Sequence, residues 1–387
     1  MSGLLIAGGT VDVAIDGERI TLVGAARPSG ASATLDASGC SVLAGFVDVQ
    51  VNGAIGVDLA TEPERVGEVA AFLVECGVTS FMPTVISSTP SATARAIEIL
   101  ESWRLAAPPA RSRSLGVHLE GPFLNPARAG AHPPDNLRPP CRDEAAAWSH
   151  AAGVAMVTLA PELAGAVELI GDLVGRGVVV CAGHTDADGP TLVAALAAGL
   201  SGATHLFNAM GPMSARRPGT AGAILDRTGP IDGPVAGLIA GLIVDGLHVD
   251  PAMVRLAWRL IGQQGIALVT DAMAALGLPF GNFVIGDTPV VVGADGARTV
   301  DGVLAGSVVR FDDAVRKLIE FTGCTLDAAS TAASETPARL AHRSDIGVLT
   351  PGRLADVVLL DSDLRVAATV VGGTVAFDRD GRLTWRS

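Results

Sequence analysis

The sequence predicts an α/β fold in which a (β/α)8 TIM barrel carries a small β-sandwich domain formed from both chain termini. Between residues 44 and 345, eight short apolar runs alternate with longer amphipathic stretches, which is the pattern of βα units and a parallel sheet. Polar side chains stand at or just after the ends of most of these runs, where barrel active sites are assembled. Eight units of this length fit a closed barrel better than a doubly wound sheet.

The two ends of the chain differ from this central region. Residues 1–43 and 346–387 contain short alternating strands with Gly and Asp turns, and neither segment is long enough to bury a core alone. We therefore expect the two segments to combine into one small β domain, and residues 44–345 to form the barrel.

The composition of the 387 residues argues against several classes of protein. Hydrophobic residues make up 49% and charged residues 17%, so a large core can be buried and a disordered chain is not expected. A net charge of -13 and an aromatic content of 4% argue against a nucleic-acid or membrane surface. The N-terminus reads as a strand rather than a signal peptide, and no apolar run reaches the ~18 residues of a membrane helix. Five widely spaced cysteines suggest reduced thiols in a cytoplasmic protein: Cys40, Cys76, Cys141, Cys181 and Cys324.

The elements of the predicted barrel can be placed along the chain. Helix-like stretches at 63–76, 90–103 and 251–264 repeat apolar residues at intervals of three and four. Residues 280–298 are typical of an inserted hairpin, and residues 311–322 of a last barrel helix. The eight strand candidates begin at Gly45, Val78, Leu115, Val154, Val178, Ala203, Leu238 and Ile266.

Three residues at strand ends have the chemistry of a metal site. Glu120, His184 and His205 supply one carboxylate and two imidazoles, which are common ligands of catalytic zinc. Their wide separations form no local motif, and a lone histidine after a strand is more often a core or capping residue. Only a barrel brings the three together, so the metal site depends on the fold. Asp271, at the end of the eighth run, is well placed to take a proton from a metal-activated water.

The first run, GFVDVQVNG at 45–53, has an unusual polar face. Asp48, Gln50 and Asn52 point to one side of a strand whose other residues are mostly apolar. Polar groups on a buried strand need hydrogen-bond partners or a function. Because Gln50 and Asn52 stand at the carboxyl end of this strand, we expect them to lie in the site.

A set of motifs follows in order along nearly the whole chain. They are GFVDVQVNG, GVHLEGPF followed by GAH, AGHTDA, THLFNAM followed by RPG, VDGLHV, LVTDAM, LAGS at 304–307, and GVLTPGRLADVVLLD. As a set they resemble the N-acetylglucosamine-6-phosphate deacetylase family of the amidohydrolase superfamily. GHTDA or LADVV alone would indicate only a generic amidohydrolase.

The resemblance implies a particular metal site. Many amidohydrolases have His-x-His at the end of the first strand as ligands of one metal, and Gln50 and Asn52 stand at these positions. Amides bind zinc poorly, so the two residues mark a vestigial second-metal position. Glu120, His184 and His205 would hold one divalent metal per subunit, zinc in the first place, with Fe2+ or another divalent ion as alternatives.

The resemblance also implies roles in substrate binding. His132 would polarise the acetyl carbonyl, although the sequence alone slightly favours an exposed loop histidine. Arg216 would reach the neighbouring subunit's site in a homodimer, and Arg217 replaces the glutamate that is more usual in the family. The other contacts to the sugar phosphate would be Asn208, the backbone amide of Ala209, and His248.

Together these assignments predict one reaction. A single-metal-activated water would hydrolyse the N-acetyl group of N-acetyl-D-glucosamine 6-phosphate to D-glucosamine 6-phosphate and acetate, with Asp271 as general base and then acid. N-acetylgalactosamine 6-phosphate is the alternative substrate, because the sequence does not reveal the contacts to one hydroxyl. Amidohydrolases that open cyclic amides or deaminate usually need the missing His-x-His pair. From another class, a non-catalytic amidohydrolase-like scaffold is opposed by the intact ligand set.

Overall fold

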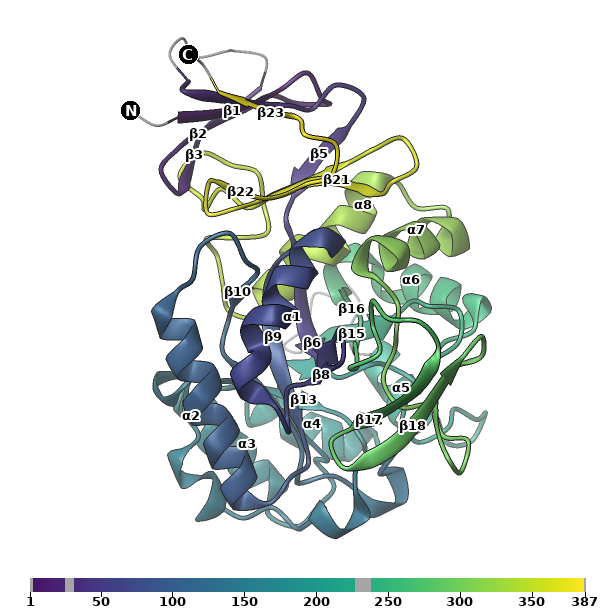
Figure 1. Ribbon diagram of the computed structural model, residues 1–387. Helices are drawn as coiled ribbons and strands as arrows, with labels where there is room; N and C mark the ends of the chain where they lie inside the picture. Colours follow the sequence, from purple (N-terminus) through teal and green to yellow (C-terminus); the bar gives the residue numbers. More distant parts are fainter. Residues whose placement is uncertain (1–2, 25–30, 227–237, 386–387) are drawn as a thin grey trace.

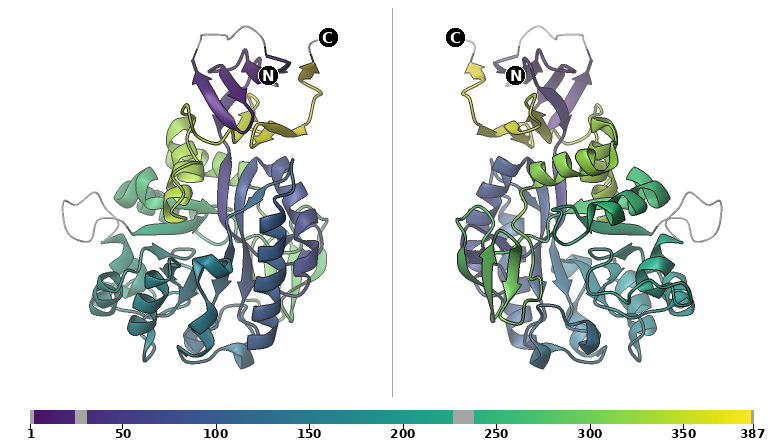
Figure 2. Two further views of the ribbon diagram at one scale, coloured as in Figure 1. Left: turned by 90° about the vertical axis from the view of Figure 1, so that its left-hand side faces the viewer. Right: turned by 90° about the vertical axis from the view of Figure 1, so that its right-hand side faces the viewer.

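The computed structural model describes residues 3–24, 31–226 and 238–385. It consists of a barrel and a smaller β domain to which both ends of the chain contribute (Figure 1, Figure 2). Of the two predicted terminal segments, residues 1–2, 25–30 and 386–387 lie outside the described ranges. Within those ranges, the helices are all too short or too polar to cross a membrane.

The barrel is a nearly closed ring of parallel, buried strands, which confirms the predicted fold class. Each strand pairs with the next one in chain order. The chain after β16 returns to β6, where the backbone N–H of Asn52 donates to the Ala272 carbonyl over 2.7 Å. In the described ranges the eight barrel strands are β6 (Phe46–Val51), β9 (Val78–Ile86), β11 (Val117–Glu120), β12 (Val154–Leu159), β13 (Val179–Ala182), β14 (Gly202–Ala203), β15 (Ile239–Ile243) and β16 (Ile266–Val269).

Helices pack around the outside of this ring (Figure 1). Four of them begin at a residue whose side chain accepts a hydrogen bond from the first turn, namely Thr89, Asp188, Asp250 and Thr325, and the first three have proline in that turn. The predicted last barrel helix is present with the expected bounds, as α7. The helices are α1 (Val66–Leu73), α2 (Pro90–Ala106), α3 (Ala166–Gly175), α4 (Gly189–Ala197), α5 (Gly219–Leu225), α6 (Pro251–Gly265), α7 (Phe311–Thr322), α8 (Leu326–Ser330) and α9 (Thr336–Leu340).

A long loop follows β11 in place of an α-helix. Residues 121–153, all within the described part of the chain, form only short 3-10 turns, at Pro126–Arg128, Pro134–Asn136, Glu144–Ala147 and His150–Ala152. Long loops in compact domains are commonly functional. This one starts at the carboxyl end of a barrel strand and carries Arg128 and His132 into the site.

The smaller domain is a β-sandwich of two sheets that share one apolar core. In one sheet the C-terminal strand β23 pairs with β4, and in the other β20 pairs with β5, so the two termini are joined in both sheets. The first sheet has the order β23 (Leu383–Trp385), β4 (Ala33–Asp36), β1 (Gly3–Ala7), β2 (Val13–Asp16), β3 (Arg19–Val23). The second has the order β22 (Thr374–Asp378), β21 (Val366–Val371), β20 (Val357–Leu360), β5 (Ser41–Ala44). The domain boundaries at residues 43 and 346 stay a prediction.

The insertion before α7 forms three antiparallel strands, where a two-stranded hairpin was expected. They are β17 (Gly281–Ile285), β18 (Thr288–Gly293) and β19 (Gly296–Thr299). The chain makes a second tight turn after β18, and Gly296 has the φ of 98° that favours glycine there. The expected stretch therefore contains two turns rather than one.

Short strand pairs complete the two ends of the barrel. β7 (Gly53–Ala54) and β8 (Val57–Asp58) pair with each other directly after β6. β10 (Arg113–Ser114) pairs with β9. Arg113 also forms an ion pair with Asp356 over 2.7 Å, which ties the barrel to the chain leading into the sandwich.

Candidate active site

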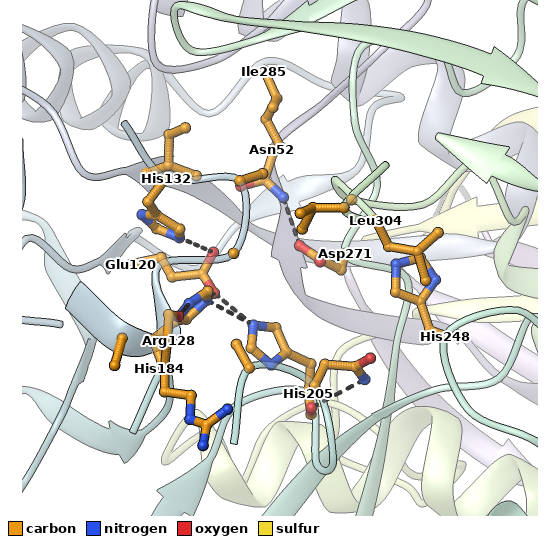
Figure 3. Close-up of a pocket in the computed structure, with 18 residues that line it drawn as sticks. Asn52, Glu120, Arg128, His132, His184, His205, His248, Asp271, Ile285 and Leu304 are labelled. Carbon is orange, nitrogen blue, oxygen red and sulfur yellow. Dashed lines mark hydrogen bonds and ion pairs between the residues drawn. The ribbon is translucent and has the colours of Figure 1, made fainter. Parts of the chain in front are cut away.

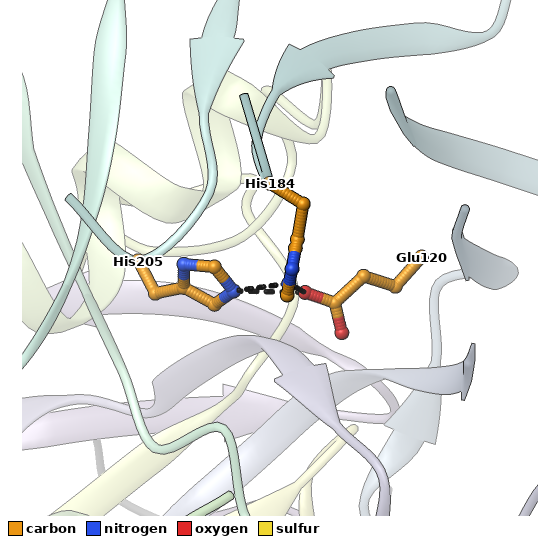
Figure 4. Close-up of side chains that lie close together, drawn as sticks. All are labelled: Glu120, His184 and His205. Atoms are coloured by element: carbon orange, nitrogen blue, oxygen red, sulfur yellow. Dashed lines mark hydrogen bonds and ion pairs between the residues drawn. The ribbon is translucent and has the colours of Figure 1, made fainter. Parts of the chain in front are cut away.

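Glu120, His184 and His205 meet at the carboxyl ends of the barrel strands (Figure 4). Glu120 is the last residue of β11, and the two histidines follow β13 and β14 closely. Glu120 Oε1 lies 3.2 Å from His184 Nε2 and 2.9 Å from His205 Nε2, and the two Nε2 atoms are 3.1 Å apart. All three side chains are buried. Among the described residues, they form the one group with metal-binding geometry, with ligand atoms within 4.8 Å of one another.

The geometry of these three residues fits a divalent metal ion. The Nδ1–H of His184 donates to the Arg128 carbonyl over 2.8 Å, so the lone pair of His184 Nε2 faces the other ligands. Ligand atoms arranged tetrahedrally around zinc lie roughly 3.3 Å apart, close to the observed separations. Burial alone would raise the pKa of Glu120, but its interactions with His184 and His205 hold that pKa well below its usual value. Glu120 is therefore ionised, as a metal ligand must be.

The backbone is strained where the site residues leave their strands. His184, His205 and Asp271 have φ angles of 50°, 29° and 50°, in the left-handed region that side chains with a Cβ disfavour. Such conformations cost about 1–3 kcal/mol each and cluster at functional sites. The same strain at three strand ends supports placing these residues in one site.

Gln50 and Asn52 hold the carboxylate of Asp271. Asn52 Nδ2 donates to Asp271 Oδ1 over 2.7 Å, and Gln50 Nε2 donates to the same oxygen over 3.0 Å. Gln50 Nε2 also lies 3.1 Å from Glu120 Oε1, so one amide bridges the two carboxylates. The amides of the first strand therefore fix Asp271 relative to the cluster that fits the metal.

Asp48, the third residue of this polar face, acts on the barrel rather than on the cavity. Its Oδ2 accepts a hydrogen bond from the Thr270 hydroxyl over 2.5 Å, which ties β6 to the residue before Asp271. Burial raises the pKa of Asp48 to about 7. The polar face of the first strand thus has partners at all three positions.

Asp271 has the properties of a proton-transfer group. Burial raises its pKa to about 6, and the negative charge of Glu120 adds to the rise. A carboxyl group with this pKa can accept a proton near neutral pH and release it again. Asp271 lines the same cavity as the metal-binding cluster, so a bound molecule can reach both.

His132 enters the site as a neutral hydrogen-bond donor. Its Nδ1 accepts a hydrogen bond from the Ser87 backbone N–H over 3.2 Å and lies 2.9 Å from the Ser87 hydroxyl. The proton of the neutral ring is therefore on Nε2, which lies 3.8 Å from Glu120 Oε2. Burial lowers the pKa of His132 to about 3, so the ring is uncharged at neutral pH. It is buried, which argues against an exposed loop residue.

The predicted site residues surround one cavity of about 280 Å³ (Figure 3). Gln50 does not line it but donates to both Glu120 and Asp271, which do. Arg216 is exposed and lines a neighbouring cavity of about 1230 Å³ instead. The other predicted residues line the first cavity: Asn52, Glu120, His132, His184, His205, Asn208, Ala209, His248 and Asp271.

His248 is held in place by Asp245. Asp245 Oδ2 lies 2.7 Å from His248 Nδ1, and Asp245 Oδ1 accepts the backbone N–H groups of Leu247 and His248. Burial alone would raise the pKa of Asp245, but these hydrogen bonds keep it below its usual value. With Nδ1 donating to Asp245, the Nε2 atom of His248 remains for a bound molecule.

Arg128 and Glu162 contribute to the site and were not predicted. The carbonyl of Arg128 orients His184, as described above. Glu162 accepts hydrogen bonds from the Asp186 backbone N–H over 2.6 Å and from the Thr185 hydroxyl over 2.5 Å, which fixes the chain directly after His184. Glu162 had a signal in the sequence, because it stands just past the fourth run, in TLAPE. Arg128 had none, because it lies in the middle of a loop.

A nearly closed barrel with a buried carboxylate–imidazole cluster and a proton-transfer carboxylate at its carboxyl end defines a hydrolase of the amidohydrolase class. The model of the amidohydrolase family matches residues 41–380 of the chain. The chain therefore belongs to the amidohydrolase family, and the relatives described below place it among the N-acetylglucosamine-6-phosphate deacetylases.

Three relatives document this membership. The N-acetylglucosamine-6-phosphate deacetylase of Bacillus subtilis (strain 168) is 35% identical over 373 residues, covering 94% of this chain and 92% of the relative. The Homo sapiens protein of the same name is 38% identical over 357 residues, covering 89% and 85%. A mutant of the Mycobacterium smegmatis deacetylase, solved in complex with N-acetyl-D-glucosamine-6-phosphate, has a TM-score of 0.86 at 32% identity and covers 97% and 98%.

Proposed function

We propose that this protein removes the acetyl group of N-acetyl-D-glucosamine 6-phosphate and releases D-glucosamine 6-phosphate and acetate. The names of the relatives in Bacillus subtilis and Homo sapiens support this substrate, as does the complex of the Mycobacterium smegmatis protein. The observation that carries the proposal is the position of Asp271, which two amide hydrogen bonds hold beside the Glu120–His184–His205 cluster.

We propose one divalent metal ion per subunit, zinc in the first place, held by Glu120, His184 and His205. When bound, such an ion lowers the pKa of a water molecule and polarises a carbonyl group. Gln50 and Asn52 support a single ion, because both amides donate hydrogen bonds to carboxylates at the position where many amidohydrolases have two histidines.

Asp271 would move the proton. With a pKa of about 6 it is mostly ionised at neutral pH and can accept the proton of the attacking water. The protonated carboxyl group then donates this proton to the nitrogen of the acetamide as the C–N bond breaks. The amine leaves and acetate remains.

His132 would stabilise the negative charge that develops on the acetyl oxygen. Its Nε2–H is a neutral donor whose orientation is fixed by Ser87. A donor held in place before the reaction needs no reorganisation, and removing one such donor typically costs ~10²–10³ in kcat.

The sugar phosphate would bind at the side of the cavity away from the metal. Asn208 and the backbone amide of Ala209 line the cavity and can donate hydrogen bonds to a phosphate, and Nε2 of His248 belongs to the same lining. Arg216, which is exposed in this subunit, would complete the site of the neighbouring subunit in a cytoplasmic homodimer.

The decisive experiment is acetate release from N-acetyl-D-glucosamine 6-phosphate, with metal content determined on the same sample, purified without a metal-binding tag. We expect about one metal equivalent per chain and turnover that a chelator abolishes. Faster turnover of N-acetyl-D-galactosamine 6-phosphate would show the other epimer to be the substrate. No turnover of either sugar after metal is restored would favour a scaffold.

A further inference from the structure

The charged side chains of the cavity are mostly acidic, which is unfavourable for an anionic substrate. Glu120 and Asp271 both line it, and the chain as a whole carries a net charge of -13. Of the described residues that line this cavity, only Arg128 is a lysine or arginine. A phosphate group that enters therefore meets one permanent cation from the same subunit.

Arg128 is fixed at this position by its own backbone and side chain. Its carbonyl accepts the Nδ1–H of His184 over 2.8 Å. Its Nε donates to Asp186 Oδ1 over 2.7 Å, in an ion pair whose side chains are 31% and 38% exposed. Neither Nη atom of Arg128 has a hydrogen-bond partner within the described part of the chain. The two Nη groups, which suit a phosphate, are thus left open.

The ion pair places Arg128 beside the turn that contains Asn208 and Ala209. The Thr185 backbone N–H donates to the Ala209 carbonyl over 3.1 Å, so the residue before Asp186 is paired with this turn. The Gly211 backbone N–H in turn donates to the Thr185 carbonyl over 3.2 Å, so this pairing extends past the turn. The guanidinium of Arg128 is therefore held next to the proposed phosphate contacts.

The direction of the side chain also fits a phosphate. In Figure 3, Arg128 runs away from the metal-binding cluster on the side of His184, and its guanidinium ends apart from Glu120 and Asp271. The acetamido group and the phosphate of the proposed substrate are on different carbons of the sugar ring. With the acetamide at Asp271, a cation at the other side of the cavity can reach the phosphate.

From this geometry we propose that Arg128 binds the phosphate of the substrate from within the same subunit and determines the preference for phosphorylated sugars. The inference rests on the proposed function. Arg128 has two tasks, since its backbone orients a metal-binding histidine and its side chain binds the anion. Arg128 also lines the neighbouring cavity in which Arg216 lies, so arginines could approach the phosphate from two directions.

The test compares kcat/KM for N-acetyl-D-glucosamine 6-phosphate with kcat/KM for unphosphorylated N-acetyl-D-glucosamine in wild type and Arg128→Gln. Glutamine keeps the backbone carbonyl that orients His184 and removes the charge. We expect the ratio of the two kcat/KM values to fall by roughly 10- to 100-fold, the size of a lost charge-assisted hydrogen bond. Arg128→Lys, which keeps the charge without the planar fork, should recover part of the ratio.

Two controls separate this effect from a general loss. Arg95→Gln removes another ion-paired arginine, on α2 and outside the cavity, and should leave the ratio unchanged. Metal content should be equal in all variants. An equal fall on both sugars, or no change on either, would overturn the inference and show that the Arg128 side chain only packs or forms a surface ion pair.

Failure of the proposed function can be distinguished from failure of the phosphate site at Arg128. If wild type releases no acetate from the phosphorylated sugar, the function is wrong, and Arg128 is then judged by calorimetry with inorganic phosphate alone. Weaker phosphate binding by Arg128→Gln than by wild type would support the anion site. Equal binding would overturn it.

Discussion

The two halves of the candidate site hold their carboxylates by different chemistry. At the ends of β11, β13 and β14, Glu120 and two imidazoles bring three ligand atoms within 4.8 Å, an arrangement that fits a cation. At the end of β6, Gln50 and Asn52 donate amide hydrogen bonds of 3.0 and 2.7 Å to Asp271. The first half thus fits the proposed metal, and the second supplies hydrogen-bond donors to the carboxylate that we propose as the base.

This difference supports the proposal of a single metal ion. An amide cannot contribute the negative charge or the imidazole lone pair that divalent ions prefer. Its N–H groups can, however, donate hydrogen bonds that orient a carboxylate. Asp271 is thus hydrogen-bonded by amides rather than by further metal-binding side chains, and its pKa is about 6. A second metal at this position would compete for the same oxygen.

Removing Glu120 from the proposed metal site should have the largest effect on acetate release. Glu120→Ala deletes the carboxylate to which both histidines are bonded. We expect metal content to fall toward zero and acetate release to fall to background, because two imidazoles alone bind weakly. Elemental analysis and the acetate assay check this. Full metal content in the variant would contradict the assigned ligands.

Removing the carboxylate of Asp271, the proposed base, should lower turnover somewhat less. Asp271→Asn keeps the size of the side chain and abolishes proton transfer, so we expect kcat to fall by ~10²–10⁴ while the metal stays bound. Turnover and metal content are measured on the same preparation. Turnover within about tenfold of wild type would sink the assignment of Asp271 as general base.

Replacing the two amides at the end of β6 by histidines tests the comparison of the two halves directly. Gln50→His combined with Asn52→His restores the imidazole pair of many amidohydrolases. We expect metal content to rise from about one toward two equivalents, and turnover to fall by roughly tenfold because Asp271 loses its amide donors. A metal content that stays at one equivalent would mean that the amides do not decide the number of ions.

Removing one amide hydrogen bond to Asp271 should have the smallest effect, a shift in the pH profile. The proposed base Asp271 can accept a proton only when it is ionised, so kcat/KM of wild type should fall as the pH drops through about 6. The hydrogen bond from Asn52 lowers the pKa of Asp271, and its loss in Asn52→Leu should move this limb to higher pH by about one unit.

The matched control for the pH profile is Asn282→Leu, which changes an exposed asparagine on the inserted sheet. Its profile should coincide with that of wild type. An acid limb in Asn52→Leu that does not move, or that moves to lower pH, would show that Asn52 does not stabilise the ionised form of Asp271.

Much of the architecture could be read from periodicity. The predicted strands of the barrel are present, and α7 begins and ends where the apolar spacing placed it. The short β14 (Gly202–Ala203) could not be delimited, because the predicted run continued through His205, where the backbone leaves the strand with a φ of 29°. The third strand of the inserted sheet was missed because residues 280–298 were interpreted as a single hairpin, although Asp295-Gly296 marks a second turn.

The candidate site was predictable to the extent that its residues stand at strand ends. Glu120, His184 and Asp271 were found in this way, because parallel strands of a barrel all end at one face. Arg128 was not found, since a loop residue has no position that periodicity can fix. The two roles given to Arg128 depend on where residues 121–153 fold back over the barrel.

The sequence by itself determined the fold class, the strand ends and the types of side chain available there, because these follow from local periodicity and residue chemistry. Only the tertiary structure decided distances. It gave Gln50 two carboxylates to bridge, buried Asp271 so that its pKa rises, and placed Arg128 in the lining of the cavity. Hydrogen bonds and electrostatic fields act over a few ångströms, and residues far apart in the chain reach such distances only in the folded barrel.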